Sequence, residues 1–393
     1  MAAQSPKADE RRSREPAMTD DTELQYWIAF SRIPTVGRVR LGLLEGQFGT
    51  LETAWSAGAS ELRASGLDRN VVDAITEHRG TIDPAKEIER VKTAGVTVLT
   101  WHDADYPALL REIDDLPPIL YMKGQFPQDD PAVTIVGTRR PTAYGREVAA
   151  HLAGELAEAG VAVISGLARG IDGEAHRATL KAGGRTVAVL GCGVDVTYPS
   201  EHAQLMEQMT ESGAVLSEYP LGTKSEARHF PRRNRLLSGL SVATLVIEAG
   251  HGSGTLSTVK FALEQNREVL CVPGSIYSPA STLTNKLIQE GAKPILNVRD
   301  VLDKIRALPL IETQQALPGL IHESTAEEST IYDALAYEPQ HVDDLSRATG
   351  LPVTSITGTL TIMELQGRVL QVGRMNYIRA RESKASYRSS EEK

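Results

Sequence analysis

Cysteine, aromatic residues and long apolar runs are all scarce in this chain of 393 residues. Its two cysteines, Cys192 and Cys271, both stand in short apolar runs, which predicts reduced, buried thiols in a cytoplasmic protein rather than a disulfide framework. No apolar run approaches the ~20 residues that a membrane helix needs, so we expect no membrane insertion. Residues 1–20 have no apolar segment of the kind found in secretory signals.

Several sequence motifs of enzymes and cofactor sites are also missing. The sequence contains no G-x-x-x-x-G-K-[ST] loop for ATP, no strand followed by G-x-G-x-x-G, and no G-x-S-x-G turn. Its nine histidines are scattered without zinc-site spacing. His176 follows Asp172 at i+4, but no nucleophile accompanies them, so a polar contact on a helix face is the better reading. We expect no metal, no cofactor and no catalytic activity.

The formal net charge of −9 excludes a protein that coats nucleic acid with its whole surface. One stretch is nevertheless basic. Residues 224–241 carry five Lys or Arg against the single Glu226. Alone, such a run suits a solvated helix face at least as well as a binding patch.

The chain divides by pattern into a helical segment, a strand-and-helix segment and a small terminal domain. We expect disordered tails at 1–20 and 381–393, where polar and charged residues dominate. Residues 21–92 predict helices only. The turn at 33–37 is similar to a helix-hairpin-helix, which can hold a phosphate; a plain helical bundle explains it equally well.

Residues 93–306 alternate short apolar runs with helical stretches. The runs are 96–101, 132–137, 161–166, 186–191, 214–218, 243–249, 268–274 and 294–297. Continuous rather than alternating apolarity indicates strands buried on both faces. The sequence therefore predicts an α/β domain with an extended Rossmann-like, mainly parallel sheet wrapped by helices, and its ligand site at the carboxyl ends of the strands.

After a predicted linker at 307–328, residues 329–380 predict three helices and a β-hairpin, the pattern of a winged helix. The third of these helices has Glu364 as its only formal charge. Because a helix that contacts phosphates is normally basic, we favour a partner-binding or vestigial winged helix over a DNA-reading one.

Three predicted strands lead into loops rich in glycine, at residues 137–145, 166–173 and 250–255. Each loop combines glycines with hydroxyl groups or arginines immediately before a helix. Glycine lets a ligand approach the backbone, and N–H groups at the helix start favour an anion. Arg139 and Arg169 add guanidinium groups suited to phosphate oxygens. Three such loops at one sheet edge predict a phosphate-rich ligand.

The ordered motifs VGTRRPTAYG, SGLARGIDGEAH, LGCGVDVTYP, SEYPLG, HFPRRNRLLSGLS, VIEAGHGSGTL, VPGSI and TNKLIQEGA resemble the DNA-processing protein A family, also called DprA or Smf. The resemblance covers about 130–293 strongly. It implies a dimeric, non-enzymatic protein that binds and protects single-stranded DNA and loads the RecA recombinase during natural transformation.

Matching the family's motifs to this chain gives its site. Thr138 replaces a serine of the family, Arg169 stands where many relatives have lysine, and Leu237 replaces isoleucine. Leu283 occupies a position that is often glycine, which bears on close ligand approach at that loop only. The residues that the resemblance and the loops assign to DNA or phosphate are Gly137, Thr138, Arg139, Arg140, Gly166, Leu167, Ala168, Arg169, Gly170, Asp172, Arg232, Arg233, Asn234, Arg235, Gly250, Gly252, Ser253, Gly254 and Thr255.

Phe230 and Tyr219 are candidate stacking platforms for bases, although burial is the simpler explanation of Phe230. With few side chains able to read base edges, binding should be largely independent of DNA sequence. The resemblance, together with the apolar run 262–276, predicts a homodimer formed through the C-terminal part of the sheet.

Two alternatives stay open at this point. The run GHGSGT is similar to the PGGxGT turn of phosphoribohydrolases, where a catalytic Glu follows the Thr. Here Leu256 and Ser257 follow Thr255, and the next acid is Glu264. A nucleotide-sensing domain would share the phosphate loops without needing the basic segment.

Overall fold

The computed structural model describes residues 20–307, 326–335, 340–365, 369–371 and 375–379. The predicted tails, apart from Asp20, and most of the predicted linker lie outside the described residues. The chain forms two compact units that divide near residue 310. No helix in the described parts is both long enough and apolar enough to cross a bilayer.

Six helices precede the sheet: α1 (Asp21–Ser31), α2 (Arg38–Phe48), α3 (Leu51–Ser56), α4 (Ala59–Ala64), α5 (Arg69–Arg79) and α6 (Pro84–Thr93). Polar side chains begin several of them, because they accept N–H groups that the first helical turn leaves unpaired. Asp20, Thr50, Asp68 and Asp83 all accept such bonds, and Pro84 fits the first position of α6.

The sheet has nine strands in the order β1-β2-β6-β5-β4-β3-β7-β8-β9. They are β1 (Thr97–Thr100), β2 (Ile119–Gly124), β3 (Ala132–Val136), β4 (Ala162–Ser165), β5 (Thr186–Val189), β6 (Ala214–Ser217), β7 (Ala243–Val246), β8 (Glu268–Cys271) and β9 (Lys293–Pro294). All neighbours from β6 to β9 are parallel, whereas β2 is antiparallel to both β1 and β6. The predicted α/β class with a mainly parallel sheet is confirmed.

Strand β2 was absent from the sequence prediction, and the predicted strand at 294–297 shrinks to two residues. The apolar start of β2, residues 119–122, pairs on both sides and is buried. Leu296 falls beyond β9 and is exposed, because only Lys293 and Pro294 pair with β8.

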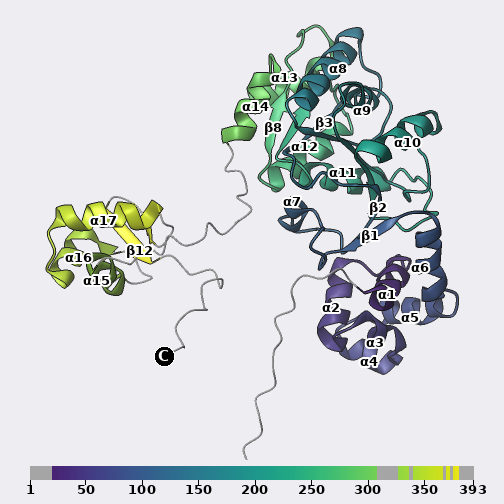
Figure 1. The fold of residues 1–393 in the computed structure, drawn as a ribbon, viewed down its shortest axis with the longest axis horizontal. Helices are drawn as coiled ribbons and strands as arrows, with labels where there is room; N and C mark the ends of the chain where they lie inside the picture. The colour runs from purple at the N-terminus through teal and green to yellow at the C-terminus, as the bar shows by residue number, and fades with distance from the viewer. Residues whose placement is uncertain (1–19, 308–325, 336–339, 366–368, 372–374, 380–393) are drawn as a thin grey trace, which may run out of the picture. The chain divides into compact units, whose positions relative to one another are not determined.

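Helices cover both faces of the sheet (Figure 1). One face packs against α8 (Ala143–Glu158), α9 (Ile171–Lys181) and α14 (Val298–Ala307), and the other against α7 (Ala108–Arg111), α11 (His229–Gly239), α12 (Thr255–Glu264) and α13 (Thr282–Gln289). Helix α10 (Ala203–Ser212) and the short turns η1 (Ser200–His202) and η2 (Pro279–Ser281) complete this part. Cys192 and Cys271 are buried free thiols, and burial raises their pKa values to about 11 and about 12.

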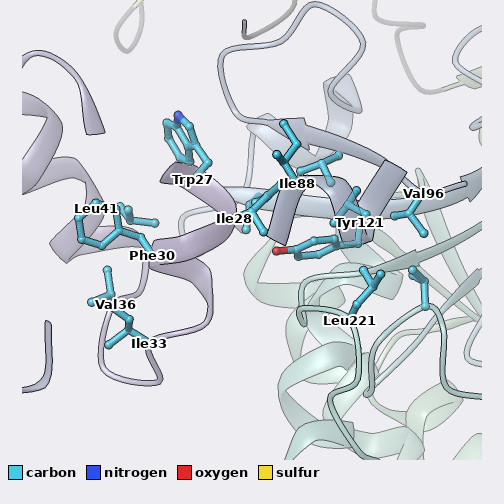
Figure 2. Close-up of a cluster of buried hydrophobic side chains, with 14 of the residues drawn as sticks. Trp27, Ile28, Phe30, Ile33, Val36, Leu41, Ile88, Val96, Tyr121 and Leu221 are labelled. Atoms are coloured by element: carbon cyan, nitrogen blue, oxygen red, sulfur yellow. The ribbon is translucent and has the colours of Figure 1, made fainter. Parts of the chain in front are cut away.

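The six N-terminal helices share a hydrophobic core with the β1–β2 end of the sheet. Figure 2 shows Trp27 and Ile28 from α1 together with Tyr121 of β2 and Leu221 after β6. The Tyr121 hydroxyl lies 2.7 Å from the hydroxyl of Ser31 at the end of α1. The helical segment and the sheet are therefore packed as one body.

The second unit contains α15 (Ala326–Ala334), β10 (Gln340–His341), α16 (Val342–Thr349), α17 (Val353–Leu365), β11 (Val369–Gln371) and β12 (Asn376–Arg379). Its strands form a separate sheet in the order β10-β12-β11. A small core joins the helices and the sheet, with Ile331, Leu345, Leu360 and Val369 fully buried. Three helices with this small sheet make the predicted winged helix.

Candidate functional site

A pocket of about 750 Å³ opens where β3, β4 and β7 end, at the carboxyl edge of the sheet. All three glycine loops contribute to it, as does the start of α11. The lining residues are Val136, Gly137, Thr138, Arg139, Arg140, Ala168, Asp172, Tyr198, Ser225, Ala227, Phe230, Pro231, Arg233, Asn234, Leu237, Gly250, His251, Gly252, Ser253, Gly254, Thr255, Ser257 and Thr258. The position agrees with the rule that ligands of open α/β sheets bind beyond the strand ends.

The loops that follow β3, β4 and β7 are bonded to one another. The Thr138 amide donates to the carbonyl of Glu248 at 2.7 Å, and the Ile171 amide donates to the carbonyl of Thr138 at 3.2 Å. Gly170 has φ +79°, and a Cβ there would stand 2.4 Å from the Thr138 carbonyl oxygen. Only glycine fits this approach, so the pocket floor is preorganised.

Asp172 and Arg233 hold the Gly166 loop from beneath. The Asp172 carboxylate accepts the amides of Gly166 at 3.1 Å and Ala168 at 3.4 Å, while Arg233 donates to the Gly166 carbonyl at 2.9 Å. Burial raises the pKa of Asp172 and lowers the pKa of Arg233 to about 10. Leu167 between these contacts is fully buried with φ +52°. Both charged groups line the pocket, but their bonds serve the loop itself.

Arg139 and Arg140 supply the free positive charge of the pocket. Both are exposed, and neither pairs with a carboxylate among residues 20–307 or the described parts of the second unit. The Arg139 guanidinium lies over the half-buried ring of Phe230, 5.3 Å from its centroid. The ring of Tyr198, which the sequence did not single out, lies 5.5 Å from Phe230. Cation and aromatic faces thus meet at one rim.

Arg169 is exposed but already has a partner. Its guanidinium makes two hydrogen bonds to the carboxylate of Glu201, one of them at 2.8 Å. Arg169 and Gly166 line a small hollow beside the main pocket. Arg139 and Phe230 line both the hollow and the main pocket. A phosphate that binds Arg169 must therefore compete with Glu201.

Arg235 and Arg232, both expected at the DNA site, do not line the pocket. The side chain of Arg235 is 3% exposed and donates to Asp115 at 2.9 Å and to Glu218 at 2.8 Å. Arg232 also pairs with Glu218, at 3.5 Å. The reason is where each residue lies around helix α11. Phe230, Arg233, Asn234 and Leu237 line the pocket, and their three- and four-residue spacing puts them on one face of the helix. Arg232 and Arg235 lie on other faces.

Helix α12 brings the third loop into the pocket. Gly252 has φ +74°, and the Ser253 hydroxyl accepts the amide of Thr255 at the first turn of the helix. Asn234 of α11 donates to the Ser257 hydroxyl at 2.7 Å, which joins the two helices. Hydroxyl and amide groups therefore converge on the Gly250–Thr255 side, where the positive end of the α12 dipole points.

Two further sequence expectations concern Tyr219 and Leu283. Tyr219 does not line the pocket: its ring stacks on His229 at 4.3 Å, and burial raises its pKa to about 12. Leu283 is buried at the start of α13, where its amide donates to the Ala249 carbonyl at 2.9 Å. Leucine at this position therefore packs inside the domain.

Acidic groups are sparse around the pocket. Asp172 is the one carboxylate among the lining residues, and the amides of Gly166 and Ala168 already bind it. Within the described residues, no group of three or more His, Cys, Asp or Glu side chains is placed to hold a metal ion. The exposed charges among the lining residues are therefore positive.

Comparison with known proteins shows the family of this chain. Residues 97–306 match the family described as DNA recombination-mediator protein A, and residues 315–373 match the DprA winged helix domain. Protein Smf of Synechocystis is 35% identical, with 91% of this chain and 99% of that protein covered. DNA processing protein DprA of Bacillus subtilis is 42% identical over 54% of this chain and 72% of its own length.

The solved structures include a similar chain. The X-ray structure of DNA processing protein A from Streptococcus pneumoniae superposes with a TM-score of 0.63 and 31% identity, covering 73% of this chain and 99% of that one. Sequence and structure agree on the family and on the winged helix at its C-terminus. This chain belongs to the DNA recombination-mediator protein A family, whose members include the DprA and Smf proteins.

Proposed function

We propose that the pocket at the carboxyl edge of the sheet binds single-stranded DNA and that the protein acts as a recombination mediator. The observation that carries this proposal is the unpaired guanidinium of Arg139, held over Phe230 between the glycine loops. A phosphate would bind the guanidinium and the nearby amides, while a base could stack on Phe230 or Tyr198. Membership of a DNA recombination-mediator family supports the choice of ligand.

Binding should depend little on DNA sequence and should shield the bound strand. Arginines, backbone amides and ring faces recognise the phosphate and the π-face that every nucleotide has. The amide side chain of Asn234, the lining group most suited to reading a base edge, already donates to Ser257. The proposal is for a protein without catalytic activity, since the single lining carboxylate already accepts two amides.

We further propose that the protein is a homodimer and that it loads RecA onto the bound strand. Part of the run 262–276 is core: Ala262 and the β8 residues Leu270 and Cys271 are buried. Leu263 on α12 and Leu296, which follows the edge strand β9, are by contrast 60% and 78% exposed. Large exposed aliphatic side chains favour a contact with a second copy.

Light scattering at tens of micromolar tests the dimer. We expect twice the chain mass for the wild type and the single-chain mass for Leu263→Glu. A monomeric wild type would contradict the dimer. RecA loading is tested by RecA-driven strand exchange on DNA coated with a single-strand binding protein, where addition of this protein should shorten the lag.

The DNA proposal is tested by Arg139→Ala with Arg185→Ala as the matched control. Arg185 is an exposed arginine paired with Asp130, and it precedes β5 at the opposite edge of the sheet. Loss of one charge-assisted phosphate contact should weaken oligo(dT) binding by about 1–3 kcal/mol, about 5- to 150-fold. It should also flatten the slope of log affinity against log salt by roughly 0.7.

Fluorescence anisotropy at several salt concentrations measures both quantities, and a mixed-sequence oligonucleotide should give the same loss. Melting temperatures of both variants should stay near the wild-type value, because the Arg139 guanidinium has no bond within the described fold other than its contact with Phe230. Equal affinity of Arg139→Ala and wild type would show that DNA binds elsewhere. Binding of mononucleotides with no effect on oligo(dT) would favour nucleotide sensing.

A further inference from the structure

A second hollow, of about 570 Å³, lies between helix α2 and the loop that follows β1. Arg38, Val39 and Gly42 line it from α2, and Trp101, His102 and Arg111 from the loop and α7. We refer to these residues as the α2 groove. None of them belongs to the glycine loops or to the basic stretch 224–241. The helical segment and the sheet domain pack as one body, so the groove is a fixed feature.

The α2 groove carries uncompensated positive charge. Arg38 is exposed, and it has no hydrogen bond or ion pair in the described part of the chain. Arg111 donates to the backbone carbonyls of Trp101 and Asp103, and its guanidinium lies 5.2 Å from the centroid of the Tyr106 ring. The Glu45 carboxylate lies 2.8 Å from Nε2 of the lining residue His102, and this contact raises the pKa of that imidazole. The ligand that complements this groove is therefore an anion.

Apolar and aromatic surface accompanies the charge. Val39 is 70% exposed, and nothing lies within 4 Å of the position that a Cβ on Gly42 would occupy. The partly exposed ring of Trp101 is fixed nearly perpendicular to Trp27 on one side, with centroids 5.7 Å apart, and to His102, at 5.9 Å. Proteins that bind single strands combine a basic groove for the backbone with aromatic rings on which bases stack. The fixed ring of Trp101 beside two arginines is such a combination.

The α2 groove and the main pocket lie at the same edge of the sheet. Strand β1 is antiparallel to β2, and β2 to β6, so β1 runs in the direction of the parallel strands and Trp101 follows its carboxyl end. In the order β1-β2-β6-β5-β4-β3 there are five strand spacings of about 4.8 Å, roughly 24 Å between the ends of β1 and β3. A strand of several nucleotides can reach from one to the other.

We propose that the α2 groove is a second contact for the same DNA strand, with Arg38 and Arg111 on phosphates and Trp101 beneath a base. This inference rests on the proposed function, because the main pocket sets where the strand begins. It assigns the helical segment a direct part in strand binding, and it makes affinity depend on the length of the strand.

The experiment compares Arg38→Glu with Arg69→Glu on two oligo(dT) lengths, one of about 3 nucleotides, which is too short to span the roughly 24 Å between the sites, and one of about 20 nucleotides. Arg69 is an exposed arginine of α5 in the same helical segment, and it does not line the groove. We expect Arg38→Glu to weaken the long oligonucleotide by about five- to tenfold and to leave the short one unchanged. Arg69→Glu should change neither.

Tryptophan fluorescence gives an independent reading. The long oligonucleotide should quench emission and the short one should not, and Trp101→Phe should abolish that difference. Equal affinity of Arg38→Glu and Arg69→Glu for the long strand would overturn the inference, and would be the result if the groove instead holds an acidic segment of a protein. If binding of the short strand still depends on Arg139, only the role of the α2 groove is refuted. If Arg139→Ala changes the binding of neither length, the proposed function itself is refuted.

Discussion

Arg235 allows the clearest test of whether an arginine of α11 stabilises the fold or binds a ligand. Its guanidinium is 3% exposed and bonds Glu218, itself 6% exposed, together with Asp115. Arg235→Ala leaves the Glu218 carboxylate buried with only Arg232, 3.5 Å away and mostly exposed. Removing one partner of a buried pair costs about 3–5 kcal/mol. At about 1.6 °C per kcal/mol for a unit of ~290 residues, the melting temperature should fall by roughly 5–8 °C.

Urea and thermal unfolding followed by circular dichroism measure this loss, with Arg232→Ala as the control from the same helix. Arg232 is 57% exposed, so its removal should cost less than about 1 kcal/mol. Glu218→Gln in the Arg235→Ala background should recover part of the stability, because it removes the stranded charge. Folded Arg235→Ala should bind oligo(dT) with an unchanged salt slope. A variant with normal stability and a flatter salt slope would refute this reasoning and return Arg235 to the DNA site.

Three further predictions follow from the same contacts. Burial lowers the pKa of His176 to about 3 from an ordinary 6.5. The neutral imidazole therefore contributes its full stabilisation above pH 6.5, and this stabilisation is lost as the pH falls toward 3. Between pH 7 and 5 the free energy of unfolding of the wild type should fall by about 2 kcal/mol more than that of His176→Leu, as measured by urea unfolding at each pH. Glu201→Gln frees Arg169 and should strengthen oligo(dT) binding with no change in melting temperature, so unaltered affinity would remove Arg169 from the site. Gly137→Ala places a Cβ 2.6 Å from a core side chain and should cost about 1–3 kcal/mol, whereas Gly154→Ala, in an open helical position, should stabilise by up to about 1 kcal/mol.

The sequence predicted the sheet and the meeting of the glycine loops because both follow from local pattern. A strand that ends in glycine before a helix has its loop at the carboxyl edge, whichever tertiary contacts form later. Which arginine of α11 faces the pocket could not be predicted from the sequence. Arg232, Arg233 and Arg235 stand in one basic run, and the residue at which the helix begins decides which of them lies on the pocket face. Assigning that start from sequence would have separated them.

Other features depend on contacts between distant residues. Glu201 neutralises Arg169 from 32 positions away, and nothing in either local pattern signals the pair. Strand β2 is a short apolar run after Pro117 and Pro118, and its place in the sheet comes from pairing with β1 and β6 rather than from a helix-and-strand rhythm. Tyr198 reaches the rim of the pocket because Phe230, far along the chain, lies beside it.

The core shared by the helical segment and the sheet changes what can be removed from this protein. The family match begins at residue 97, yet a chain cut there would present Val98 and Tyr121 to water, with Ser31 no longer beside the tyrosine hydroxyl. The helices therefore cover one end of the sheet permanently, and on heating the helices and the sheet should unfold in a single transition. We expect a relative that lacks these helices to carry polar side chains where this chain has Val98 and Tyr121, so the two positions would indicate from sequence alone whether the helices are present.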